Sequence, residues 1–197
     1  MGDGSLLGEL EAIEERLDAR RARRAGLARL QELFGSARAP DPVPEGFFEG
    51  RPLALSVSAV LDRLVRRIAD FYTPWLGKRF EPSAGRGVNV LAPSARAPMR
   101  LLWPSYIPER ELVDRIEAFP FKVWRGAGEV DREVETLKVD YSWDRSPDPL
   151  VRRLRDDLVE LEDGLLLGKS LLRVREGYRE LGYFSLKESD KPATRPP

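Results

Sequence analysis

The stretch that decides the fold runs from Lys138 to Phe184 and reads KVDYSWDRSPDPLVRRLRDDLVELEDGLLLGKSLLRVREGYRELGYF. Its ends alternate apolar and polar residues with a period of two, which is typical of β-strands. Asp163-Gly164 is a strong signal for a tight turn. The segments Leu165–Val174 and Tyr178–Lys187 flank a second turn at residues 175–177. The stretch therefore predicts antiparallel strands joined by hairpins.

One part of this stretch predicts a short helix instead. Pro147 and Pro149 open a segment that we expect to be helical to about Leu158. A helix would place Asp156 and Asp157 beside several arginines. Paired carboxylates can bind a cation or act as acid and base, but this setting favours surface ion pairs.

Further strands are predicted on the N-terminal side of this stretch. They cover residues 47–56, 75–80, 88–91, 119–125 and 134–143. Residues 57–73 have apolar residues at helical spacing, and residues 92–110 are rich in proline and predicted to be irregular. Many sequential strands favour a closed barrel, because closure removes exposed strand edges. The predicted fold class is mainly β, an antiparallel barrel with accessory helices.

The N-terminal region predicts one long amphipathic helix over residues 5–34, with Gly35 as its stop. We expect residues 1–37 to hold this helix and residues 38–46 a Pro-rich linker. The barrel domain then spans residues 47–187, and residues 188–197 form a disordered tail. The helix either packs on the barrel or recruits a partner, with self-association as one form of the second alternative.

Composition excludes several classes of function. The 197 residues contain no Cys and no His, and 33 basic residues balance 33 acidic ones. Disulfides, thiolate or imidazole catalysis and zinc-finger sites are therefore excluded. The balanced charge gives no field that attracts nucleic acid. We expect no metal, no cofactor and no nucleic-acid partner.

The sequence also bears on the compartment. No run of about 18 apolar residues predicts a membrane span. The first residues lack a basic segment followed by an apolar one, as a signal peptide would have. We expect a cytoplasmic protein.

Candidate ligand-binding residues are polar or aromatic residues within strands that are predicted to be partly buried. Lys78 and Lys169 are the most prominent, because each follows a Leu-Gly pair inside an apolar strand. Such a lysine is either a surface residue with a buried stem or an inward charge with a carboxylate partner. Asp140 and Glu160 are candidate partners. The other candidate binding residues are Asn89, Lys138, Tyr141, Trp75 and Trp124.

Several short motifs resemble the uncharacterised bacterial lipocalin-like proteins of the calycin type, with GXWXG-like domains. They are Trp75-Leu76-Gly77-Lys78-x-Phe80, Val139-Asp140-Tyr141, Asp157-Leu158-Val159, Leu165–Lys169 and the final GYFSL. The resemblance covers about residues 47–187. The chain has Asp-Tyr where that pattern has Tyr-Asp, and it lacks the Gly-x-Trp-x-Gly itself. The resemblance implies a barrel and transfers no reaction, since this fold hosts carriers and enzymes alike.

Three hypotheses on function follow. In the leading one, the barrel binds a small apolar ligand, whose polar or acidic group meets Lys78 or Lys169. In the second, the same barrel is a cofactor-independent enzyme of the decarboxylase, isomerase or hydrolase type, with catalytic residues unknown. In the third, the N-terminal helix makes the protein an interaction module.

Overall fold

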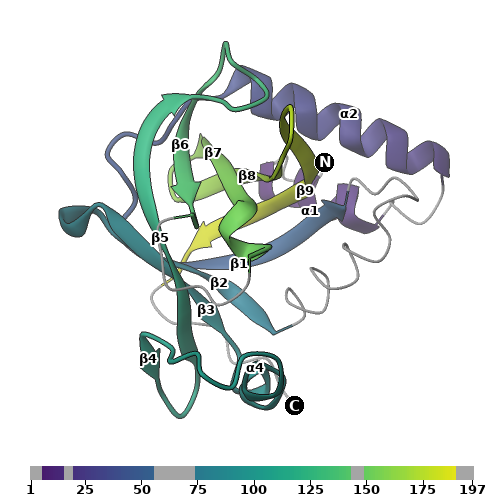
Figure 1. Ribbon diagram of the computed structural model, residues 1–197. Coiled ribbons are helices and arrows are strands. Elements are labelled where there is room, and N and C mark those ends of the chain that lie inside the picture. Colours follow the sequence, from purple (N-terminus) through teal and green to yellow (C-terminus); the bar gives the residue numbers. More distant parts are fainter. Residues whose placement is uncertain (1–5, 16–19, 56–73, 143–148, 190–197) are drawn as a thin grey trace.

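The computed structural model describes residues 6–15, 20–55, 74–142 and 149–189, which form a β-barrel with helices outside it (Figure 1). The predicted helix over residues 57–73 lies outside the described residues, as does most of the predicted tail. The strands are β1 Gly46–Leu55, β2 Trp75–Glu81, β3 Arg86–Leu91, β4 Arg110–Glu111, β5 Ile116–Ala127, β6 Glu135–Asp140, β7 Leu154–Glu162, β8 Leu165–Val174 and β9 Gly177–Glu188. The helices are α1 Leu6–Glu15, α2 Arg20–Ser36 and α4 Arg96–Leu102, with single 3-10 turns at Pro82–Ala84, Pro93–Ala95 and Val151–Arg153.

The barrel closes because its two ends pair. The strands follow the order β3-β2-β1-β9-β8-β7-β6-β5-β4, and β3 also pairs with β5. Eight strands therefore form a closed antiparallel barrel, and the two-residue β4 lies outside it on β5. Closure leaves no exposed edge within this ring of strands. The prediction of an antiparallel barrel is confirmed.

Side chains divide between the inside and the outside of the barrel wall. On β6, Leu137 and Val139 join the inner apolar cluster, as does Tyr141 just beyond it. Lys138 and Asp140 alternate with them and lie on the outer side. This is the alternation that the sequence predicts, since successive residues of a strand point to opposite faces.

The N-terminal region forms two helices rather than the one long helix predicted. The Arg29 Nε atom lies 2.7 Å from the Glu9 carboxylate, so the residues that contain these groups are close in space. In one continuous helix they would be roughly 30 Å apart along the axis. Helices α1 and α2 therefore do not continue as one straight helix.

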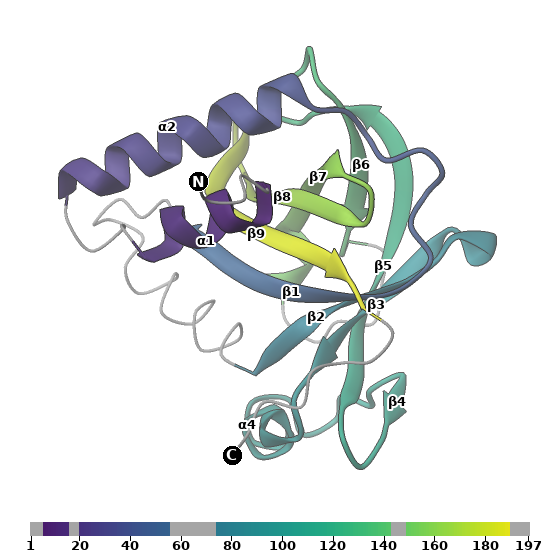
Figure 2. The same cartoon turned by 180° about the vertical axis from the view of Figure 1, so that it is seen from behind.

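Helices α1 and α2 cover part of the outer wall (Figures 1 and 2). Leu30 and Phe34 of α2 are fully buried, and so is Leu10 of α1. They pack in one cluster with outward residues of the barrel such as Val159 and Leu167. This packing corresponds to the alternative in which the N-terminal segment covers its own domain.

Two other predicted segments differ from the structure. The predicted helix that ends near Leu158 is wrong, because residues 154–162 form β7. The apolar residues of that segment fit a helical spacing, but β6 and β8 recruit it into the sheet from both sides. Residues 96–102 were predicted to be irregular and form α4, with Pro98 in the first turn, where its missing N–H has no helical partner to lose.

Candidate functional site

A buried polar cluster lies inside the barrel, centred on the ammonium group of Lys78. The Lys78 Nζ atom lies 3.0 Å from Asp156 Oδ2 and donates a hydrogen bond of 3.1 Å to Asn89 Oδ1. It also donates to the Tyr141 hydroxyl, which itself donates to Asp156 Oδ2 at 3.0 Å. These residues come from β2, β3, β7 and the end of β6, so the cluster ties distant parts of the barrel together.

An irregularity in β2 places two of the predicted residues on the same side of the wall. Between Trp75 and Gly77 the register with β3 shifts by one residue. Leu76 consequently joins an outer cluster, while Trp75 and Lys78, three positions apart, both point inward. A β-bulge has this effect because the extra residue reverses the alternation beyond it. Gly77 has a φ of 147°, and a Cβ atom there would lie 2.0 Å from the carbonyl oxygen of Phe48.

Asn89 connects the cluster to β5, the strand that pairs with its own strand β3. Its Oδ1 atom accepts a hydrogen bond of 3.2 Å from the Trp75 indole and one from Lys78. Its Nδ2 group donates to the carbonyl oxygen of Phe119 at 3.1 Å. The amide is thus oriented by its partners, and Asn89 acts as a positioning residue for the Lys78 ammonium.

Aromatic rings surround the ammonium group. The Lys78 Nζ atom lies 5.0–5.5 Å from four ring centroids, those of Trp75, Phe121, Tyr141 and Phe184. At such distances a cation is attracted by the ring faces, most strongly where water is excluded. The site therefore combines an apolar wall with a small number of polar groups, as ligand-binding sites do.

Three inward glycines let these rings lie against the wall. A Cβ atom at Gly168 would come within 2.2 Å of the Phe184 ring. A Cβ atom at Gly50 would lie 2.3 Å from the Trp75 ring, and one at Gly87 would lie 2.4 Å from the Phe121 ring. Each ring therefore lies against a glycine of a neighbouring strand, where a larger residue would not fit.

The cluster is incomplete at one atom. Asp156 has only 1% of its surface exposed, yet its Oδ1 atom has no hydrogen-bond partner among the described residues. Most buried polar atoms in proteins have a partner, so an exception calls for an explanation such as a water or ligand. Burial lowers the pKa of Lys78, and the nearby Asp156 opposes this shift without cancelling it.

Three of the predicted site residues lie together on the outer face instead. Lys138 donates a hydrogen bond of 2.9 Å to Asp157, and Asp140 accepts one of 2.8 Å from Arg155. The Arg155 guanidinium also lies 5.4 Å from the Trp124 ring, which is 40% exposed. Burial raises the pKa of Asp157. Lys138, Asp140 and Trp124 therefore do not share the interior with Lys78.

Lys169 lies on the outer face too, beneath α2. Its ammonium group donates to Asp131 and, at 2.7 Å, to Gln31 of α2. Tyr183 donates to the same Gln31 oxygen at 2.7 Å, and Glu180 lies 3.7 Å from the Lys169 Nζ atom. Burial raises the pKa of Tyr183 above its usual range. Lys78 and Lys169, the two lysines predicted as alternative partners for the polar end of the ligand, thus lie on opposite sides of the barrel wall.

Asp156 is the site residue that sequence reasoning missed. It was assigned to a helix and to surface ion pairing, which is wrong, since Asp156 and Asp157 are both buried in a strand. The signal available was the series Leu154, Asp156, Leu158 at a period of two, which predicts one face of a strand with an acid at its centre. Glu160, one of the proposed lysine partners, lies at the edge of a surface pocket instead.

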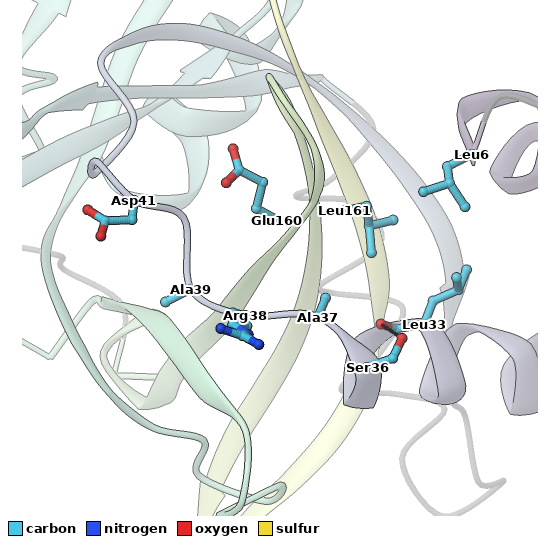
Figure 3. A pocket seen from close by; sticks show the side chains of 9 residues that line it. All are labelled: Leu6, Leu33, Ser36, Ala37, Arg38, Ala39, Asp41, Glu160 and Leu161. Atoms are coloured by element: carbon cyan, nitrogen blue, oxygen red, sulfur yellow. Dashed lines mark hydrogen bonds between the residues drawn. The ribbon is translucent and has the colours of Figure 1, made fainter.

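Two surface pockets lie outside the barrel interior. One, of about 420 Å³, is formed by α1, α2, the linker and β7 (Figure 3). The carboxylates of Asp41 and Glu160 lie toward one end and the leucines 6, 33 and 161 toward the other. The second pocket, of about 430 Å³, lies between α4 and the segment that follows it. Within the described ranges no group of three or more acidic side chains is arranged to hold a metal ion.

Comparison with known proteins adds little to this geometry. No family model matches the chain, and no curated protein matches it. A solved structure, described as a protein from Thermomonospora curvata, is 16% identical over 82% of this chain and 86% of that one, with a TM-score of 0.48. Its description names no activity. Among the described helices none is long and apolar enough to cross a membrane.

Proposed function

We propose that the protein is a lipocalin-like binding protein that holds one small, largely apolar ligand inside its barrel. Barrels of eight strands are either filled by their own side chains or hold one small ligand. Aromatic rings would bury the body of the ligand, and the Lys78 cluster would meet its polar end. The observation that carries this proposal is the buried Asp156 oxygen, which has no hydrogen-bond partner in the described part of the chain and lies near that aromatic wall.

The cluster favours a hydrogen-bond donor at the polar end of the ligand. An ammonium group has three N–H donors, and those of Lys78 face Asn89, Tyr141 and Asp156. An acidic ligand would have to displace one of these partners. A hydroxyl, amide or amine group can instead donate to Asp156 Oδ1 and satisfy it. A ligand that leaves a buried polar atom unpaired loses affinity.

Three aromatic probes of similar shape test this proposal: benzyl alcohol, toluene and benzoate. Titration monitored by tryptophan fluorescence and by native mass spectrometry should give benzyl alcohol the highest affinity. Toluene lacks the donor, and benzoate brings a second anion next to Asp156. The Lys169→Met variant is the matched control, because it changes the outer face only and should keep the order. Absence of saturable binding by all three probes would contradict the proposal.

A further inference from the structure

Lys78 has the surroundings of a reactive amine as well as those of a ligand contact. It is 1% exposed, as is Lys169, and Lys138 is 3% exposed. The exposed fractions of the three lysines are therefore similar. The lysines are distinguished by the groups that surround each amine. Lys138 and Lys169 lie on the outer wall, and both oxygens of the Asp131 carboxylate beside Lys169 are hydrogen-bonded. The Lys169 amine also lies over the Phe34 and Tyr183 rings. Lys78 instead faces the barrel interior, with four aromatic rings, a phenol hydroxyl and a carboxylate whose second oxygen has no partner among the described residues.

We propose that Lys78 condenses reversibly with the carbonyl group of an apolar aldehyde or ketone, so that the barrel holds its ligand as an imine. This inference rests on the proposed binding of a small apolar ligand inside the barrel, and it names the chemical class of that ligand. A carbonyl compound acquires the hydroxyl donor that Asp156 Oδ1 favours when the amine adds to it. A carbonyl compound has the apolar body that the aromatic wall accepts. Its carbonyl group condenses reversibly with an amine, with loss of water and without an oxidant or a reductant.

The first half of the reaction uses the contact between Lys78 and Asp156. A proton moves from the Lys78 ammonium to the Asp156 carboxylate, 3.0 Å away, which frees the nitrogen lone pair. That pair forms a C–N bond with the carbonyl carbon, and the π electrons of the C=O bond move to the oxygen. The Tyr141 hydroxyl, in contact with both groups, relays one proton from nitrogen to that oxygen. The product is a neutral carbinolamine.

The second half uses the oxygen of Asp156 that has no partner. The carbinolamine hydroxyl donates to Asp156 Oδ1 or receives the proton that Asp156 now carries. When it receives that proton, the C–O bond breaks, water leaves, and the nitrogen lone pair forms the C=N bond. The protonated imine replaces the ammonium group one charge for one charge. The restored Asp156 carboxylate and the surrounding rings stabilise it as they stabilise the ammonium.

The amine must lose its proton for this reaction, and the site favours that step. Burial lowers the pKa of Lys78, so a larger fraction of this group is neutral than for an exposed lysine at the same pH. Reactive lysines in other proteins are activated by the same combination of desolvation and a neighbouring acid or base.

Reductive trapping tests the inference on the full-length protein. The protein is incubated with benzaldehyde and cyanoborohydride, which reduces an imine to a stable benzylamine, and modified lysines are located by peptide mass spectrometry. We expect Lys78 to be modified first, ahead of the exposed Lys122 and Lys187 and of the equally buried Lys138 and Lys169. An excess of benzyl alcohol should slow modification of Lys78 and leave that of Lys122 unchanged.

The Asp156→Asn variant identifies the role of the carboxylate. It keeps the size of the side chain and removes the proton acceptor, so the initial rate at Lys78 should fall on the order of 100-fold, the usual scale of general acid–base catalysis. The rate at Lys122 in the same molecule reports whether the protein and reagents are intact. Asn89→Asp is a second variant, which places a carboxylate on the other side of the amine and should retain trapping at Lys78.

The outcomes separate the two proposals. If benzaldehyde and benzyl alcohol bind inside the barrel but Lys78 stays unmodified, or is modified no faster than Lys169, the imine is overturned and ligand binding stands. If no probe binds and Lys78 is not trapped, both proposals fail. An unchanged rate at Lys78 in the Asp156→Asn variant overturns the assigned role of the carboxylate and, with it, the proposed reaction.

Discussion

The two Leu-Gly-Lys segments end in lysines with opposite environments. Lys169, outside the barrel, lies beside Asp131, Gln31 and Glu180 and over two aromatic rings, and its acid partner has both oxygens in hydrogen bonds. Lys78, inside the barrel, has an acid partner with one oxygen that no described residue contacts by a hydrogen bond. The outer cluster is a completed polar network that fastens α2 to the wall. The inner cluster has an open position, and this difference distinguishes a structural charge pair from a candidate site.

Removing one acid from each cluster should give the largest difference between them. Asp156→Ala leaves the Lys78 ammonium buried without a carboxylate, which costs about 3–5 kcal/mol when a buried pair is broken. Asp131→Ala should cost less, because Glu180 remains 3.7 Å from the Lys169 Nζ atom. Urea unfolding of both variants measures the free energies of unfolding.

A double replacement provides the control for this comparison. Lys78→Met with Asp156→Leu removes both charges at similar volume, so most of the lost stability should return. If Asp131→Ala lowers the free energy of unfolding as much as Asp156→Ala does, Glu180 does not compensate for the lost carboxylate beside Lys169.

Glycine replacement inside the wall should give the next largest effect. Gly168→Ala places a methyl group 2.2 Å from the present position of the Phe184 ring, and overpacking of this kind costs about 1–3 kcal/mol. The displaced ring must move toward the Lys78 ammonium, so benzyl alcohol should also bind more weakly. Gly126→Ala is the matched control, since its new methyl group would meet its nearest neighbour at 3.9 Å. Equal stability of the two variants would mean that the rings do not depend on the glycines.

Replacing Gln31 should weaken the hydrogen bonds that attach α2 to the barrel wall. This side chain accepts hydrogen bonds from Lys169 and Tyr183 and donates one to Asp131. Gln31→Leu leaves these groups buried with fewer partners, at a cost of about 1–3 kcal/mol. Hydrogen exchange should become faster in α2 and stay unchanged in β2 and β3. Faster exchange at Lys78 and Asn89 would show that the two clusters are coupled.

The smallest effect is a dependence of stability on alkaline pH. Burial lowers the pKa of Lys78 in the folded protein below the ordinary lysine value of 10.5. At pH values between the lowered pKa and the ordinary one, the unfolded chain therefore binds more protons at this residue than the folded protein does. Stability contributed by this group therefore rises with pH across that interval. The difference in unfolding free energy between the wild type and Lys78→Met should rise with pH accordingly. A difference that falls with pH would contradict the assigned direction.

The sequence predicted the strands well because their apolar residues alternate and their turns carry Asp-Gly or glycine signals. It also predicted Trp75, Lys78, Asn89 and Tyr141 as site residues, and in the structure the other three lie around the Lys78 ammonium group. The same reasoning could not separate Lys78 from Lys169, because identical tripeptides carry no information on which side of the wall each lysine faces.

The remaining differences arise from long-range pairing. Asp156 was not predicted as a site residue because Leu150, Leu154 and Leu158 fit a helical spacing. The segment forms a strand because it pairs with β6 and β8. The division into α1 and α2 was not predicted because both segments have apolar residues at helical spacing. The contact between Glu9 and Arg29 depends on the packing of both helices against the barrel.

The irregularity between Trp75 and Gly77 makes the contents of the barrel depend on where β2 accommodates one extra residue. If β2 alternated regularly from Trp75 onward at its present length, Trp75 and Lys78, three positions apart, would face opposite sides of the wall. Deleting Leu76 would instead place them two positions apart, on the same face of a regular strand. The position of the bulge therefore decides which side chains of this strand fill the centre of the barrel.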